Sequence, residues 1–116
     1  MRKLGPVVVF LASLWSLPAT ANFVSYETLH QACHARVGIP ADATKWGTCF
    51  GYLSAIADAF FEDREVRGTK ACLPPQITMQ TVWDDVLAWM HEHPGNLLPN
   101  ASDMVVRAMS EVYPCK

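Results

Sequence analysis

The chain has 116 residues, of which 9 are basic, 11 are acidic and 51% are hydrophobic, and its formal net charge is −2. Its arginines and lysines are scattered, which excludes the basic stripe that is typical of nucleic-acid-binding proteins. This length predicts a single domain whose hydrophobic core alone provides marginal stability.

Residues 1–21 have the layout of a secretory signal peptide. Arg2 and Lys3 give a positive start, an apolar stretch follows at 4–17, and Ala19-Thr20-Ala21 is a small-x-small cleavage triplet. The alternative is an uncleaved anchor, but the apolar stretch is short for a membrane span and no stop-transfer pattern follows. We therefore expect cleavage after Ala21 and a mature domain at 22–116. We expect this domain to be exported, with no membrane association after cleavage.

The first two predicted elements are helices over about 25–36 and about 44–65. Ser25 can cap the first helix, and Gly38-Ile39-Pro40 ends the segment. The second helix carries apolar residues at i, i+3, i+4 and i+7 spacing. They are Trp46, Cys49, Phe50, Leu53, Ile56, Ala57, Phe60 and Phe61. The prolines of 72–75 then predict an extended segment.

Two more helices complete the predicted fold. Thr78 caps the third, which reaches His93, and Asn100 caps the fourth, in which Asp103 can bond back to the cap. Both helices have one apolar face, whereas no segment shows the alternation of a strand. The pattern therefore predicts an all-α bundle of about four helices.

Four cysteines follow the predicted leader, and an even number in an exported chain indicates disulfides. Four cysteines allow three pairings. Sequence order and the helix layout favour Cys33–Cys49 and Cys72–Cys115. On the loop-entropy model these bridges contribute about 3 and about 4 kcal/mol. A zinc site is the alternative, but the cysteines are widely spaced and form no Cys-x-x-Cys pair.

The sequence carries no pattern typical of a catalytic site. When every cysteine is paired, no thiolate is left to act as a nucleophile. The serines stand at helix starts or within helices, outside any Gly-x-Ser-x-Gly elbow. We predict a protein that is not an enzyme and that takes no cofactor.

His30 and His34 are one helical turn apart, a spacing that two metal ligands can use. Gln31 stands where the zincin pattern needs a glutamate, and no third ligand is close in the sequence. We interpret the pair as part of a polar helix face and predict no metal site. His91 and His93 suit the negative end of the dipole of the third predicted helix.

The acidic side chains do not form an obvious carboxylate pair. Asp84 and Asp85 are adjacent on a predicted helix, so their side chains diverge, and we interpret both as part of a solvated face. Asp58 interrupts an apolar run of the second helix, and its role stays open.

Several short motifs follow one another in a specific order. GYLSAIADA occupies residues 51–59. The motifs after it are Cys72-Leu73-Pro74-Pro75 through Thr78, His93-Pro94, Leu98-Pro99, Ala101 and the ending Tyr113-Pro114-Cys115. In this order and spacing they resemble the Rap/Tai immunity family over residues 49–115.

The resemblance implies a periplasmic immunity protein that protects a bacterium from type VI secretion amidases. These amidases cut the peptide stems of peptidoglycan, and immunity proteins of this kind bind the cysteine amidase and block its substrate cleft. The resemblance also implies a helical, disulfide-bonded protein, and a homodimer is an expectation because members are often dimeric.

Loops, arginines and aromatic residues dominate protein-protein recognition, so we expect the partner-binding residues to be of these kinds. The candidates are Arg64 and Arg67 in the polar run 64–70, Trp89 as an aromatic anchor, and the loop His93, Pro94, Gly95, Asn96 and Leu97. The alternative function is a periplasmic helical chaperone or a structural partner of the envelope, without a toxin partner.

Overall fold

The computed structural model describes residues 23–94 and 100–116, so the predicted signal peptide lies outside the described residues. The described part contains α1 (Tyr26–Cys33), α2 (Ala43–Ala59), α3 (Met79–Glu92) and α4 (Ala101–Val112). Short 3-10 turns at Pro40–Asp42 and Phe61–Asp63 flank α2. These ranges hold no strand beyond two isolated bridges, which confirms the all-α prediction.

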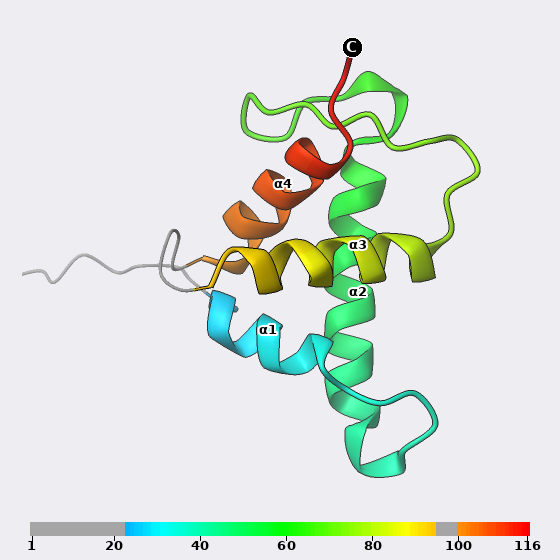
Figure 1. Ribbon diagram of the computed structural model, residues 1–116, viewed down its shortest axis with the longest axis vertical. Helices are drawn as coiled ribbons and strands as arrows, with labels where there is room; N and C mark the ends of the chain where they lie inside the picture. Colours follow the sequence, from blue (N-terminus) through cyan, green and yellow to red (C-terminus); the bar gives the residue numbers. More distant parts are fainter. Residues whose placement is uncertain (1–22, 95–99) are drawn as a thin grey trace, which may run out of the picture.

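The helices cross one another instead of lying parallel. Figure 1 shows α3 passing across the long α2, with α1 and α4 on either side of α3. Every pair of these four helices is in contact, so each one buries a face against the other three. The starts of α1 and α4 also lie side by side, because the amide of Ala101 donates to the carbonyl of Val24 over 3.1 Å.

Three of the predicted helix starts are confirmed by their capping hydrogen bonds. The side chain of Ser25 accepts from the amide of Thr28, and that of Thr78 accepts from the amide of Thr81. Asn100 accepts from the amide of Ser102 over 2.8 Å. Each bond satisfies an amide that has no partner inside its helix.

The second helix ends earlier than we predicted. α2 stops at Ala59, and Glu62 has a φ of 59°, a left-handed conformation that interrupts a helix. Phe60 is buried, whereas Phe61 turns outward and is exposed. The prediction that the helical stripe continues through Phe61 to residue 65 is therefore wrong. The turn places Phe60 in the core, and the residues after it leave the helix axis.

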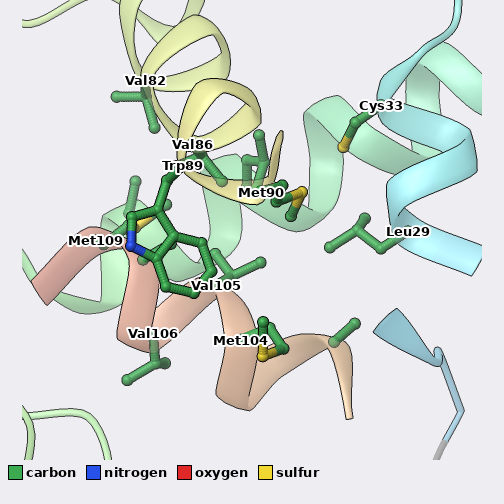
Figure 2. Close-up of a cluster of buried hydrophobic side chains, with 14 of the residues drawn as sticks. Leu29, Cys33, Val82, Val86, Trp89, Met90, Met104, Val105, Val106 and Met109 are labelled. Carbon is green, nitrogen blue, oxygen red and sulfur yellow. The ribbon is translucent and has the colours of Figure 1, made fainter. Parts of the chain in front are cut away.

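One core joins the four helices, as Figure 2 shows for its central part. Leu29 of α1, Val86 and Met90 of α3, and Met104 and Met109 of α4 meet there, and each is almost completely buried. α2 contributes Leu53 and Ala57. The unbranched methionines fill the irregular space that crossing helices leave between them.

The predicted disulfide pairing is confirmed. Cys33 of α1 is bonded to Cys49 of α2, and Cys72 is bonded to Cys115. The first bridge is buried within the core, whereas both cysteines of the second are exposed. A backbone hydrogen bond of 2.8 Å from Cys72 to the carbonyl of Tyr113 holds the chain end beside the loop before α3.

Among the described helices, none has the length and apolar character needed to cross a membrane.

Candidate partner-binding surface

One face of α4 carries a line of charged side chains. Asp103, Arg107 and Glu111 follow one another at four-residue spacing and therefore share a face of the helix. Nε of Arg107 donates to Oε1 of Glu111 over 3.1 Å. We call these three residues the α4 polar face. The other side of α4 packs Met104, Val105, Ala108 and Met109 into the core.

A tight turn beside this helix reaches one end of the α4 polar face. Val66 and Thr69 exchange backbone hydrogen bonds of 2.9 and 3.0 Å, and Arg67 and Gly68 between them have φ values of 50° and 74°. Positive φ at both central residues is the pattern of a type I′ turn. The turn directs the Arg67 guanidinium onto Asp103, with which it forms an ion pair. A cleft of about 320 Å³ lies between this turn and α4, with Arg67 and Asp103 among the residues that line it.

The end of α3 reaches the other end of the α4 polar face. The indole of Trp89 donates to Oε2 of Glu111 over 2.7 Å, and the ring of His93 stacks on the indole with 4.1 Å between centroids. Nε2 of His93 lies 3.9 Å from the same carboxylate oxygen. The Trp89 hydrogen bond, followed by that of Arg107, lowers the pKa of Glu111 below its ordinary value of 4.5.

The segment between α1 and α2, together with the first turns of α2, exposes a second surface, which is apolar. Val37 is 73% exposed, Ile39 and Phe50 are partly exposed, and the Trp46 ring stacks on Phe50 with 4.9 Å between centroids. We call these four residues the apolar loop patch. It borders a cleft of about 380 Å³, which is lined by Arg36, Val37, Gly38, Ile39, Pro40, Ala43 and Trp46.

Asp42 ties the two ends of the segment 36–42 together. Its carboxylate accepts from the backbone amide of Arg36 over 3.0 Å and from Nε of the same arginine over 3.3 Å. The backbone hydrogen bond is the main cause that lowers the pKa of Asp42 below 3.8. Phe50 belongs to the apolar stripe predicted for the second helix, but its side chain is partly exposed and stacks on Trp46 instead of entering the core.

The histidines of α1 acquire a third neighbour that the sequence did not indicate. The ring nitrogens of His30, His34 and His91 lie within 4.8 Å of one another. α1 supplies the first two and the last turn of α3 supplies the third. The interpretation of His30 and His34 as a pair without a third ligand is therefore corrected, because the crossing of α1 and α3 brings together residues far apart in the chain.

Comparison with models of protein families matches residues 25–115 to the Rap1a immunity proteins. The chain belongs to the Rap1a immunity protein family. Comparisons with curated proteins and with solved structures find no match. Because this is a family of immunity proteins and not of enzymes, the prediction of a non-catalytic protein is confirmed. Membership also implies a protein partner, the effector that the immunity protein neutralises.

Two of the predicted partner-binding residues of this Rap1a family member, Arg67 and His93, lie against the α4 polar face. Arg64 and Arg67 are exposed, and Arg67 contacts Asp103 at one end. His93 is half-buried beside Glu111 at the other end, and Pro94 is exposed. Gly95, Asn96 and Leu97 lie outside the described residues.

The expectation that Trp89 faces a partner is wrong. Its side chain is only 5% exposed, packs in the core and uses its one donor on Glu111 (Figure 2). The residue stands at the edge of the apolar stripe of α3, where α4 covers it. Local sequence patterns could not reveal this, because the covering helix begins only at Ala101, well after α3 ends at Glu92.

Asp103 and Asp85 also have roles that differ from the predicted ones. The carboxylate of Asp103 pairs with Arg67, across the surface, instead of serving the α4 cap. Asp85 is half-buried and accepts a 2.5 Å hydrogen bond from the Tyr113 hydroxyl. Burial, followed by that bond, raises the pKa of Tyr113 well above 10.0. Asp84 and Asp58 are exposed.

Proposed function

We propose that this protein protects the bacterial cell wall by binding and occluding a peptidoglycan-cleaving amidase effector of a type VI secretion system. Membership of the Rap1a immunity proteins carries the proposal, and the motif resemblance at residues 49–115 supports the amidase as the class of effector. Occlusion requires a protein-protein interface and no chemistry from the immunity protein itself.

We further propose that the protein acts in the periplasm. Two disulfides join four cysteines of the described chain, and disulfides of this kind persist in oxidising compartments. The predicted leader at 1–21 supports export, and peptidoglycan is the substrate of the proposed effector. Cell fractionation of the full chain, compared with a variant lacking 1–21, tests this location.

The α4 polar face and its two flanks form the proposed effector-binding surface. Arg67 at one end and His93 at the other end each lie beside a carboxylate of α4, and Arg107 stands between them. Arginines and histidines on a preformed surface can pair with carboxylates of a partner and speed the encounter. A stable complex needs about 800 Å² from each partner, so the surface has to extend beyond α4 over the turn at 66–69 and the end of α3.

The deciding experiment tests whether the disulfide-bonded protein inhibits a type VI secretion amidase encoded beside its own gene. A peptidoglycan-cleavage assay measures the inhibition. Stoichiometric loss of cleavage is the expected result. A folded immunity protein that leaves a live amidase fully active would overturn the proposal.

A matched pair of variants locates the surface. Arg107→Glu changes the centre of the α4 polar face, whereas Lys45→Glu makes the same charge change on α2 beside the apolar loop patch. We expect Arg107→Glu to weaken inhibition and Lys45→Glu to leave it unchanged. Equal inhibition by both variants would place the effector elsewhere on the molecule.

The apolar loop patch favours a second candidate function. Exposed apolar side chains that border a cleft are typical of surfaces that bind unfolded or partly folded clients. A periplasmic chaperone would suppress aggregation of unrelated proteins, and Val37→Ser with Ile39→Ser would remove that activity. An immunity protein would not suppress their aggregation and would recognise its amidase in spite of these substitutions.

A further inference from the structure

Three histidines from two helices converge on one small region of the surface. His30 and His34 lie one turn apart on α1, and their rings are 4.5 Å apart between centroids. His91 of α3 lies 5.1 Å from His34 and 5.8 Å from His30, again between centroids. One nitrogen from each of the three rings lies within 4.8 Å of the other two.

The backbone already selects the tautomer of His34. Its Nδ1 lies 2.7 Å from the carbonyl oxygen of His30. A carbonyl oxygen can only accept, so Nδ1 carries the hydrogen and Nε2 of the neutral ring keeps its lone pair. Metal-binding histidines show this arrangement, in which a carbonyl or carboxylate accepts from one ring nitrogen and orients the other toward the ion.

The environment also favours the neutral form of the His30 ring, which is the form that binds metal. His30 is half-buried, and this burial, followed by the charges that His34 and His91 would carry, lowers the pKa of His30 below 6.5. Glu27, one turn earlier on α1, acts in the opposite direction more weakly and adds negative charge near the cluster. The stacking of Tyr26 on His30 restricts the movement of that ring.

We propose that His30, His34 and His91 form a site for one divalent transition-metal ion, with Zn²⁺ as the preferred occupant, that links α1 to α3. Three imidazoles are a ligand set that Zn²⁺ takes, with Zn–N bonds of about 2.0–2.1 Å and a fourth position left to water. Imidazole also suits Cu²⁺ and Ni²⁺, whereas Mg²⁺ and Ca²⁺ prefer oxygen ligands.

The exposure of the cluster makes the required adjustment small. Tetrahedral zinc holds its ligand nitrogens about 3.4 Å apart, and the three nitrogens here lie within 4.8 Å. His34 and His91 are exposed, so rotation of their side chains closes the difference without disturbing the core. The ion would then connect two helices whose contact is otherwise made by core side chains.

Calorimetric titration of the untagged, disulfide-bonded protein with ZnCl₂, after dialysis against a chelator, tests the site. We expect saturation at one Zn²⁺ per chain and a rise in the unfolding temperature with zinc concentration, because the ion binds the folded state preferentially. EDTA should reverse the rise, and MgCl₂ should not produce one.

Two histidine variants at the end of α3 provide the decisive comparison: His91 lies in its last turn and His93 is its C-cap residue. His91→Asn removes the ligand that bridges the helices, whereas His93→Asn changes the one histidine outside the cluster. Loss of an outer partner of a metal ligand already lowers affinity by about 10–100-fold. We therefore expect His91→Asn to lower zinc affinity by at least about 100-fold and to abolish the thermal shift, while His93→Asn retains both.

Three outcomes would overturn the proposal. The first is the absence of saturable zinc binding to the native protein. The second is unchanged affinity of His91→Asn, which would leave only the helical pair His30 and His34. The third is an equal loss in His93→Asn, which would indicate a general effect of the surface. None of these outcomes bears on binding of the effector, because the peptidoglycan-cleavage assay measures inhibition of the amidase separately.

Discussion

The indole Nε1–H of Trp89 donates a 2.7 Å hydrogen bond to Oε2 of Glu111, and this bond joins the core to the surface. The tryptophan is buried between α3 and α4, whereas Glu111 stands on the α4 polar face and also accepts from Arg107. The position of the charged surface therefore depends on packing beneath it. A change at Glu111 should affect both stability and recognition.

Replacement of Glu111 separates its hydrogen bond from its charge. Glu111→Ala removes the acceptor of the Trp89 indole and should lower the free energy of unfolding by about 1 kcal/mol. Glu111→Gln keeps an amide oxygen as acceptor and should lower it less. Urea unfolding monitored by fluorescence measures both values. Equal losses in the two variants would show that the charge, and not the hydrogen bond to Trp89, carries the effect.

The lowered pKa of Glu111 also predicts a dependence of stability on pH. Because the carboxyl is more acidic in the folded protein than its ordinary value of 4.5, its stabilising contribution is present above that value. It is lost as the pH falls through the lower pKa of the folded state. Stability should therefore fall more steeply below about pH 4.5 in the native protein than in Glu111→Gln. Thermal unfolding at a series of pH values checks this, and parallel curves for the two proteins would contradict it.

Charge reversal of Arg64 and Arg67 should weaken effector binding without unfolding the domain. Both side chains are exposed, so the fold does not require them, but the pair of substitutions would place two new carboxylates in the segment 64–70, one of them beside Asp103 of the α4 polar face. We expect at least a tenfold loss of affinity, about 1.4 kcal/mol, with unchanged circular dichroism. Affinity equal to that of the native protein would exclude the segment 64–70 from the interface.

The ion pair between Arg67 and Asp103 provides the control for that experiment. In Arg67→Glu alone, two carboxylates meet, and their repulsion displaces the turn. Adding Asp103→Arg to Arg67→Glu restores an ion pair between positions 67 and 103. The positive and negative charges have then changed places on the surface. If binding returns with the double change, the turn's position matters to the partner. If binding by the double variant stays weak, the partner contacts the positive charge of Arg67 itself.

Loss of the α3 cap should destabilise the protein by a measurable amount. The Thr78 hydroxyl accepts from the amide of Thr81 over 3.2 Å, and Thr78→Ala leaves that amide without this partner. The expected cost is about 1 kcal/mol, and Thr78→Ser should recover most of it because serine is an equally good cap. Denaturant titration of the two variants checks the difference. Equal stability would indicate that water replaces the cap without cost.

The two disulfides should open in a defined order under mild reduction. Cys72 and Cys115 are both exposed, whereas Cys33 and Cys49 lie inside the core, where an attacking thiolate cannot reach them. Alkylation followed by mass spectrometry should find Cys72 and Cys115 labelled first. Labelling of Cys33 or Cys49 at the earliest times would show that the core opens before the chain end is released.

Most of the fold follows from local patterns that sequence analysis detects. The apolar spacing of the helices and the caps Ser25, Thr78 and Asn100 predicted where α1, α3 and α4 begin, because these are interactions between residues a few positions apart. The cysteine pairing followed from sequence order. The end of α2 was missed because it depends on a left-handed Glu62, which serves the burial of Phe60 and has no local signal.

The sequence by itself determined an all-α, disulfide-bonded domain of the Rap1a immunity type, since periodicity, caps and motif order are properties of neighbouring residues. The tertiary structure alone decided which surfaces exist. It buried Trp89 beneath α4, placed Arg67 on Asp103 and brought His91 to the histidines of α1. Each of these contacts joins residues from different elements of the fold, and how such elements lie against one another depends on how their side chains interdigitate in three dimensions.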